Sequence, residues 1–366
     1  MIYRSFGKHR ISVLGLELLG AETLTRDIDW REYLHSVSRG IELGVNYFDL
    51  GFPDFQRIST QVVSECGALL SDSGVITSLR VNIFDVESAE KLEQSVKDIL
   101  NHYGLDHAGL LQLWGINRTT WVKIQETGIL SRAKELIRAG LVGDLTLCFM
   151  DDRFYLKPIL ESESFDGLTI EYSFMDIGRG AGNLKTASDF DIDVIAHGAL
   201  KDGRLTGSLP QEIKKIWDDH PERSIAGWSL GAVWDRPEIS CALVEATSVR
   251  NIEEYARIAE FAAAGKLGVR ELLLIKQVRE LYQAKRQIQC ELCRCCMPCP
   301  LGINAPRIAE LVNEALMYGD NRIPVLRYKL EKHDGSLCSR CMRCVRACPR
   351  EFMLPDIILE AGNMLQ

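Results

Sequence analysis

The chain has 366 residues, of which 51 are acidic and 43 basic, giving a formal net charge of −8, and 46% of its residues are hydrophobic. This is the composition of a globular protein long enough to bury an extensive core, and the acidic excess argues against nucleic acid or an anionic membrane surface as a partner. No apolar run approaches about 18 residues, and charges interrupt the N-terminal segment where a signal peptide would be apolar, so we expect a cytoplasmic protein with no membrane partner.

Short apolar runs alternate with longer amphipathic stretches from residue 11 to about residue 264. The apolar runs predict strands near Val13–Leu19, Asn46–Leu50, Val75–Val81, Gly109–Trp114, Leu145–Phe149, Leu168–Tyr172, Val194–Leu200 and Ala242–Ala246. Apolar residues at three- and four-residue spacing predict helices between them, including Trp30–Leu43, Glu87–Tyr103, Thr119–Ala139 and Ile225–Trp234. Such repeated strand-and-helix units favour an α/β fold of the (β/α)8 TIM barrel type over an open doubly wound sheet. No Gly-x-Gly-x-x-Gly motif follows a strand, which argues against a Rossmann domain.

The C-terminal part differs in composition from the predicted barrel. Glu271–Lys285 is predicted to be a connecting helix and Ile308–Met317 a second helix. Of the 12 cysteines, only Cys66, Cys148 and Cys241 precede residue 290. A cytosolic chain is not expected to keep structural disulfides, so clustered cysteines there indicate metal ligands or redox groups. We therefore predict a barrel domain over residues 1–265 and a cysteine-rich domain over residues 266–366.

The C-terminal cysteines form two motifs, Cys290-x-x-Cys293-x-x-Cys296-x-x-Cys299-Pro300 and Cys338-x-x-Cys341-x-x-Cys344-x-x-x-Cys348-Pro349. The second motif has the spacing of bacterial two-cluster ferredoxins, in which three thiolates bind one cluster and the remote fourth cysteine binds the other. The motifs thus predict an α-helical, ferredoxin-like domain with two 4Fe–4S clusters. Their ligands would be Cys290, Cys293, Cys296 and Cys348 for one cluster, and Cys338, Cys341, Cys344 and Cys299 for the other.

Two structural zinc ions are the alternative for these thiolates. Zinc sites usually consist of two separated Cys-x-x-Cys pairs, so the triplets favour iron–sulfur clusters. Cys295, the ninth cysteine of this region, has no ligand role in this interpretation, and Cys66 is predicted to be a packing residue on a helix.

Several short motifs follow the predicted elements along the chain. They are Tyr3-Arg4-x-x-Gly7-Lys8, Gly44-Val45-Asn46-Tyr47-Phe48-Asp49, Ser64-Glu65, Glu171-Tyr172-Ser173, Gly203-Arg204-Leu205-Thr206-Gly207, Ala246-Thr247-Ser248 and Met297-Pro298-Cys299-Pro300. Together they resemble the aldo/keto reductase family, specifically the branch that carries a C-terminal ferredoxin-like domain with two 4Fe–4S clusters. The resemblance covers nearly the whole chain. It implies reduction of carbonyls by NADPH at the C-terminal mouth of the barrel, where barrel enzymes generally place their chemistry.

The resemblance also implies four catalytic positions, and three of them are substituted. The aspartate falls on Asp49, the tyrosine on Asp54 or Phe55, the lysine on Ser78 or Leu79, and the histidine on Trp114. Phenylalanine and tryptophan cannot deliver the proton that a developing alkoxide needs. Asp54 could deliver it only if burial strongly raised its pKa. We therefore expect negligible NADPH-dependent carbonyl reduction.

The positions that the resemblance assigns to NADPH are altered as well. Its nicotinamide contacts fall on Cys148, Phe149, Thr169 and His197. Glu245 stands near the cofactor phosphates, where the family usually has glycine, and a carboxylate repels a diphosphate unless a cation intervenes. NADPH is thus doubtful as a cofactor, and Ser248 and Arg250 remain as candidates for binding an anionic group of a nucleotide.

If the strands end as predicted, the barrel mouth is polar and of mixed charge. It is lined by Glu17, Asp49, Arg80, Trp114, Cys148, Glu171, Tyr172, His197 and Glu245. Such groups can bind a metal or exchange protons, and the catalytic candidates are Asp49, Asp54, Glu171, Tyr172 and His197. A purely structural role is the alternative for Glu171, Tyr172, His197 and Cys148.

Three functions fit these observations. The leading hypothesis is an iron–sulfur oxidoreductase that passes single electrons between a carrier, such as a ferredoxin or flavodoxin, and a small-molecule substrate at the barrel mouth. The second is a non-catalytic electron-transfer or partner-binding protein whose barrel is a scaffold. The third is an NADPH-dependent aldo/keto reductase in which Asp54 or a water replaces the tyrosine.

Overall fold

The computed structural model describes residues 1–51, 58–71, 73–176, 179–207, 209–245, 247–290 and 292–365. The chain divides into two compact units, Met1–Ser208 with Trp217–Ile275, and Leu209–Ile216 with Lys276–Gln366. The second unit therefore begins at Lys276 instead of at residue 266 and includes a short segment from within the first. Within the described ranges, no helix is both long enough and apolar enough to span a membrane.

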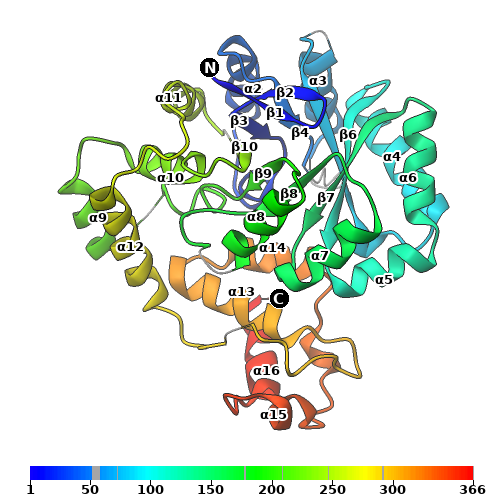
Figure 1. Ribbon diagram of the computed structural model, residues 1–366, viewed down its shortest axis with the longest axis vertical. Helices are drawn as coiled ribbons and strands as arrows, with labels where there is room; N and C mark the ends of the chain where they lie inside the picture. The colour runs from blue at the N-terminus through cyan, green and yellow to red at the C-terminus, as the bar shows by residue number, and fades with distance from the viewer. Residues whose placement is uncertain are drawn as a thin grey trace. The chain divides into compact units, whose positions relative to one another are not determined.

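Parallel strands close a barrel in the first unit, in the order β10-β3-β4-β5-β6-β7-β8-β9 (Figure 1). The strands are β3 (Leu14–Glu17), β4 (Tyr47–Asp49), β5 (Ile76–Asn82), β6 (Ala108–Ile116), β7 (Val142–Phe149), β8 (Gly167–Glu171), β9 (Val194–His197) and β10 (Ile239–Val244). Each predicted strand overlaps one of them, so the predicted α/β barrel is confirmed.

Helices surround the barrel on its outside (Figure 1). They are α1 (Ala21–Thr25), α2 (Trp30–Glu42), α3 (Thr60–Ser71), α4 (Ala89–Tyr103), α5 (Arg118–Glu126), α6 (Ile129–Arg138), α7 (Arg153–Ser162), α8 (Arg179–Asp189), α10 (Ile225–Trp234) and α11 (Val249–Ala259), with the 3-10 turn η1 (Ile83–Asp85). The single helix predicted over Thr119–Ala139 is wrong, because α5 and α6 are separate. Gly128 lies between them at φ 70°, a left-handed conformation that ends one helix and is open to glycine at little cost.

An antiparallel hairpin, β1 (Tyr3–Phe6) and β2 (His9–Ser12), precedes the barrel and was not predicted. Phe6 and Ile11 from this hairpin are fully buried. They pack with side chains from inside the barrel, namely Tyr47, Leu110, Ile195, Cys241 and Leu243. Apolar packing thus closes the end of the barrel at which the strands begin, which leaves the opposite end for polar chemistry.

The barrel interior changes from apolar to polar toward the C-terminal ends of the strands. Successive side chains of a strand point alternately into the barrel and toward the helices. On β6, Leu111 and Leu113 belong to the core cluster beneath the helices, whereas Leu110 packs in the interior apolar layer. Gln112, two residues further on, hydrogen-bonds across the interior to Thr169 of β8. A buried polar layer therefore lies above the apolar one.

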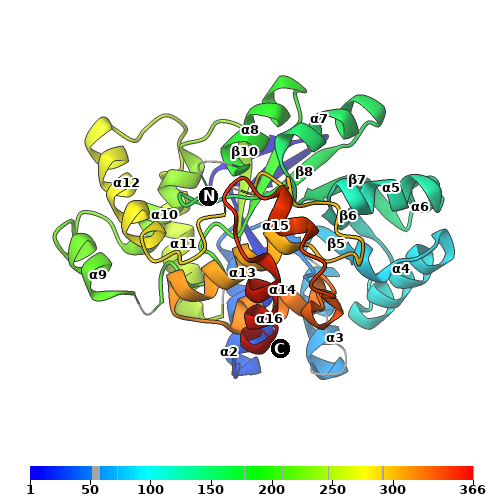
Figure 2. The ribbon, with the colours of Figure 1, turned by 90° about the horizontal axis from the view of Figure 1, so that it is seen from below.

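The second unit is helical. Its helices are α13 (Ala305–Tyr318), α14 (Arg322–Leu330), α15 (Arg343–Ala347) and α16 (Leu354–Leu365), with the 3-10 turn η2 (Gly335–Leu337); α9 (Gln211–Asp218) and α12 (Val269–Gln283) belong to it in part. α12 and α13 confirm the helices predicted over Glu271–Lys285 and Ile308–Met317. α13, α14 and α16 pack on one another (Figure 2) around Ile308, Leu311 and Ile358.

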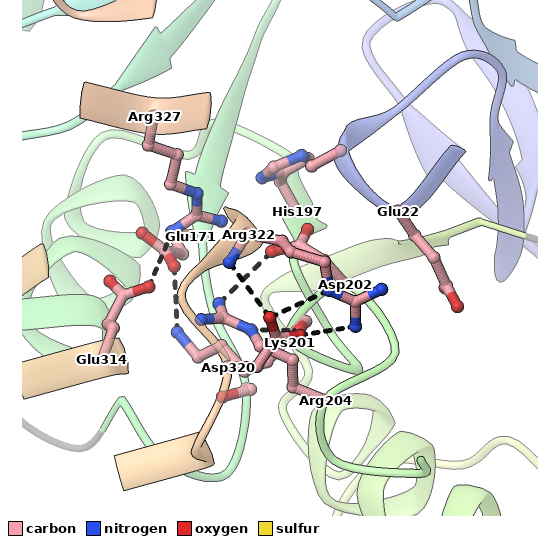
Figure 3. A network of polar contacts seen from close by, with 12 residues as sticks. Glu22, Glu171, His197, Lys201, Asp202, Arg204, Glu314, Asp320, Arg322 and Arg327 are labelled. Carbon is pink, nitrogen blue, oxygen red and sulfur yellow. Dashed lines mark hydrogen bonds and ion pairs between the residues drawn. The ribbon is translucent and has the colours of Figure 1, made fainter. Parts of the chain in front are cut away.

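Buried ion pairs hold α13 to α14. Arg307 of α13 donates to both carboxylate oxygens of Glu331, at the end of α14, with Nε–Oε2 and Nη2–Oε1 distances of 2.9 and 2.7 Å. Glu314 pairs with Arg327 at 3.4 Å (Figure 3). Burial alone would raise the pKa of Glu331, but Arg307 and His333 lower it to about 2. Glu331 is therefore ionised, and the pairs fix the two helices in register.

Candidate functional sites in the barrel mouth and the cysteine loops

The polar layer of the barrel is centred on Arg80 of β5. Its Nη1 lies 2.5 Å from Glu17 Oε1, and its Nη2 lies 3.0 Å from Asp49 Oδ1. All three residues are buried. Asp49 also accepts hydrogen bonds from the Gly51 amide at 2.9 Å and from Gln112 Nε2 at 3.4 Å. The aspartate that the resemblance assigns to catalysis is thus part of a buried ion-paired network.

The two carboxylates of this network differ in their electrostatics. Burial would raise the pKa of Glu17, but Arg80 and His197 together hold it far below its usual range. The pKa of Asp49 is raised, chiefly by burial, although Arg80 opposes this effect. Glu17 is therefore the more firmly ionised partner of Arg80.

His197 lies at the end of β9, with its side chain 14% exposed. Its Nε2 is 3.1 Å from Glu17 Oε2. An ionised carboxylate can only accept, so Nε2 carries a hydrogen and donates it to Glu17. This arrangement leaves Nδ1 as the ring nitrogen that can exchange a proton with a molecule in the mouth.

A second ion-paired group follows β9 and was not predicted. Nζ of Lys201 lies 3.0 Å from Glu171 Oε1 (Figure 3). The same Nζ lies 2.8 Å from Asp176 Oδ2. Lys201 and the next residue, Asp202, both have left-handed backbone conformations, at φ 51° and 55°. Glu171, a predicted catalytic residue, is therefore held by a buried lysine. The sequence feature that could have revealed this group is the run of charged residues Lys201, Asp202 and Arg204, which directly follows an apolar segment.

The other predicted mouth residues are buried. The Tyr172 ring packs in the core cluster against the position of Gly180, outside the polar layer. Trp114 stacks edge-on against Phe84, with ring centroids 6.0 Å apart. Burial raises the pKa of Cys148 to about 12, although Arg80 opposes it, so this thiol is neutral at physiological pH. Asp54 and Phe55 lie outside the described residues.

Carboxylates gather where the resemblance would place the cofactor phosphates. A shallow pocket there is lined by Glu17, Glu22, Asp202 and Glu245 among its residues. Glu245 accepts from the Glu22 and Thr23 amides at 2.7 and 2.8 Å. Burial, followed by these neighbouring carboxylates, raises the pKa of Glu245 well above its usual value. The pocket is thus unfavourable for a diphosphate.

Ser248 and Arg250, the predicted nucleotide-binding residues, both lie at the start of α11 (Val249–Ala259). Ser248 caps α11, its Oγ accepting from the Asn251 amide at 3.3 Å. Arg250 lies exposed in the first turn of the same helix.

The cysteines predicted as cluster ligands all lie in the second unit. Burial raises the pKa of Cys290, and the nearby thiols of Cys293 and Cys348 raise it further. A pocket is lined by the other predicted set, Cys299, Cys338, Cys341 and Cys344, together with Cys296. Cys348 thus lies near Cys290 and Cys296, and Cys299 shares a pocket with Cys338, Cys341 and Cys344, to which Cys296 also contributes. In the part of the chain that the structure describes, no group of three or more His, Cys, Asp or Glu side chains is arranged as ligands of a single metal ion.

The two cysteine loops have left-handed residues at equivalent positions. In the first motif, Leu292 and Arg294 have φ values of 55° and 58°, and at the equivalent places of the second motif Arg340 and Met342 have values of 53° and 62°. Left-handed conformations cost about 1–2 kcal/mol for such residues, and they recur at functional sites. Alternation of this kind turns successive amides into an anion-binding concavity, as at many iron–sulfur sites.

Hydrogen bonds from the helical core anchor the first loop. Asn313 of α13 accepts from the Ile288 amide at 3.0 Å and donates to the Ile288 carbonyl at 2.7 Å. Arg286 Nη2 donates to the Cys290 carbonyl at 2.9 Å. The chain therefore enters the first cysteine loop in a fixed position.

The barrel is similar to solved aldo-keto reductases. An aldo-keto reductase from Bacillus halodurans, AKR11C1, matches in its apo form with a TM-score of 0.59 and 19% identity, covering 76% of this chain and 96% of that chain. The holo form of the same protein matches with a TM-score of 0.62 and 18% identity, and with the same coverage of both chains. The thermostable aldo-keto reductase Tm1743, in complex with the inhibitor epalrestat, matches with a TM-score of 0.61 and 18% identity. This match covers 76% of this chain and 100% of that chain. These likenesses show the fold. No protein-family model matches the sequence, and no curated protein matches it.

Proposed function

We propose that the chain is an iron–sulfur oxidoreductase that holds two 4Fe–4S clusters in its helical unit and exchanges electrons with a substrate at the barrel mouth. The carrying observation is the crossed arrangement of the cysteines. Cys348 lies near Cys290 and Cys296 of the first motif, and Cys299 shares a pocket with Cys338, Cys341 and Cys344 of the second. This exchange of the fourth cysteine is the ligand pattern of two-cluster ferredoxins.

The residues of the loops fit such clusters. Cys290, Cys293, Cys296 and Cys348 would hold one, and Cys338, Cys341, Cys344 and Cys299 the other. Left-handed residues at equivalent places of both loops belong to backbone conformations that can turn amides toward an anion, where they would favour the negative charge of sulfides and thiolates. When bound, 4Fe–4S clusters accept and release single electrons.

The barrel would supply protons in this proposal. Glu17 fixes His197 through Nε2, which leaves Nδ1 free to take up or release a proton at the mouth. Lys201, held by two carboxylates, fixes Glu171, which pairs with His197 across the strand ends of β8 and β9. A substrate that gains or loses electrons at this position would be met by a group that can exchange a proton.

A second candidate function, a non-catalytic electron carrier with a scaffold barrel, is favoured by one observation. Asp49 and Arg80 form an ion pair within the interior, and both are buried. A buried ion-paired layer of this kind can have the purely structural role of holding the barrel strands in place. The two candidates differ in whether substitution of His197 changes substrate turnover.

We expect dithionite, but not NADPH, to reduce the clusters and to support activity. The carboxylates around Glu245 disfavour the diphosphate, and the sequence has Asp54 and Phe55 where the resemblance places the tyrosine. The measurement is the anaerobic loss of visible absorption after addition of each reductant, with NADPH binding followed by its fluorescence.

An NADPH-binding aldo-keto reductase provides the positive control for the fluorescence assay. Reduction of standard aldehydes by NADPH at about 1–1000 turnovers per second would contradict the proposal and support the reductase alternative.

A further inference from the structure

The surface around the second cysteine motif is strongly basic, although the chain as a whole is acidic. Residues 336–350 include four arginines and no aspartate or glutamate, whereas the net charge of the chain is −8. Arg340, Arg343, Arg346 and Arg350 are all exposed, and Arg340 forms an ion pair with Asp356. We call these four residues the arginine face. The acidic excess of the chain therefore lies elsewhere.

Two residues of the arginine face lie beside the cysteines of the second motif. Arg343 lines the same pocket as Cys338, Cys341 and Cys344. Arg346 Nη2 lies 3.5 Å from the Cys341 carbonyl, and Cys341 itself is exposed. Because a predicted cluster ligand reaches the surface between these arginines, an electron would have only a short path to a partner bound there.

Exposed apolar side chains lie among these charges. Leu337, directly before Cys338, is 56% exposed, and Leu301 of the same cysteine pocket is also exposed. Met353, three residues after Arg350 in the sequence, is another exposed apolar side chain. A small apolar centre with a charged rim is the usual anatomy of a transient protein interface.

We propose that the arginine face is the docking surface for a small acidic one-electron carrier protein of the flavodoxin type. The inference rests on the proposed function, because it takes the second motif to hold a cluster. Opposite charges steer such a carrier to the surface and orient it, while the small contact area lets it leave after transfer. The observation that selects this partner is charge complementarity, since like charges repel the carrier from the acidic remainder of the chain.

The test uses the full chain, purified anaerobically, and a fluorophore-labelled acidic bacterial flavodoxin. Binding is measured by fluorescence anisotropy over a range of salt concentrations. The variant Arg346→Glu with Arg350→Glu should weaken binding at low salt by at least about tenfold and flatten its salt dependence. The matched control is Lys157→Glu with Lys185→Glu, which makes the same charge change on exposed lysines of the barrel unit. The affinity of this control variant for flavodoxin should stay within about twofold of the wild-type value.

Equal weakening by both double variants, or no weakening by either, would overturn the proposal. A single-stranded oligonucleotide that displaces the flavodoxin at equal charge concentration would also overturn it, because the face would then bind any polyanion. Iron and sulfide are measured on every preparation, and dithionite reduction is followed in parallel. Absence of clusters would contradict the proposed function, whereas intact, dithionite-reducible clusters with unaltered flavodoxin binding would contradict the docking surface alone.

Discussion

Arg80→Met is expected to lower the free energy of unfolding of the barrel unit by about 3–5 kcal/mol, the cost of removing one partner of a buried ion pair. The methionine fills a similar volume but leaves Glu17 and Asp49 inside the barrel without their cation. Burial already raises the pKa of Asp49, so this carboxyl would take up a proton in the variant. The measurement is urea unfolding followed by circular dichroism, with the midpoint and slope compared with those of the wild type.

Lys97→Met is the matched control for this variant. Lys97 pairs with Glu93 on the surface of α4 at 2.6 Å, and exposed pairs of this kind contribute about 0–1 kcal/mol. Arg80→Lys keeps the positive charge and should recover part of the loss. An Arg80→Met protein as stable as the control would show that the polar layer does not hold the barrel together, and would leave catalysis as the reason for its charges.

Cys341→Ala is expected to remove one whole cluster, so that iron falls from about eight to about four atoms per chain. Alanine cannot bind iron, and Cys341 is exposed, so its replacement removes little packing. The remaining cluster would be that of Cys290, Cys293, Cys296 and Cys348. Iron and acid-labile sulfide analysis, with electron paramagnetic resonance of the reduced protein, measures the loss.

Cys295→Ala is the matched control, because Cys295 is equally exposed and lies inside the first motif. Its thiol hydrogen-bonds to Cys293 but does not line the pocket of the second set. The iron content of this variant should equal that of the wild type. Loss of a cluster in Cys295→Ala with retention in Cys341→Ala would show that the ligands are assigned incorrectly.

The barrel could be predicted because its strands are apolar runs separated by amphipathic helices. Every predicted strand overlaps an observed one, although β9 ends at His197, before the predicted Leu200, where Gly198 turns the chain at φ 69°. The hairpin β1–β2 was missed because its short strands mix charged and apolar residues, and its burial depends on contact with the barrel interior. The break between α5 and α6 depends on one glycine, which periodicity does not detect.

The candidate site was predictable only in part. The pairing of Asp49 with Arg80 follows from their places at neighbouring strand ends, whereas the assignment of the cysteines to two clusters stays a prediction from their spacing. Gln112 and Lys201 were missed, because a single polar residue in an apolar run does not reveal its partner across the barrel. The catalytic roles of Asp49, Glu171, Tyr172 and His197 stay predictions, as does that of Asp54, which lies outside the described residues.

The most direct test of the proposed function is the metal and sulfide content of anaerobically purified wild-type protein. The proposal predicts about eight iron and about eight acid-labile sulfide per chain, because the spacing of the two motifs assigns four cysteines to each of two clusters. Plasma emission spectrometry for iron and zinc, combined with a colorimetric sulfide assay, gives all three numbers from one preparation. About two zinc per chain with no sulfide would contradict the proposal and assign the cysteine loops to structural zinc.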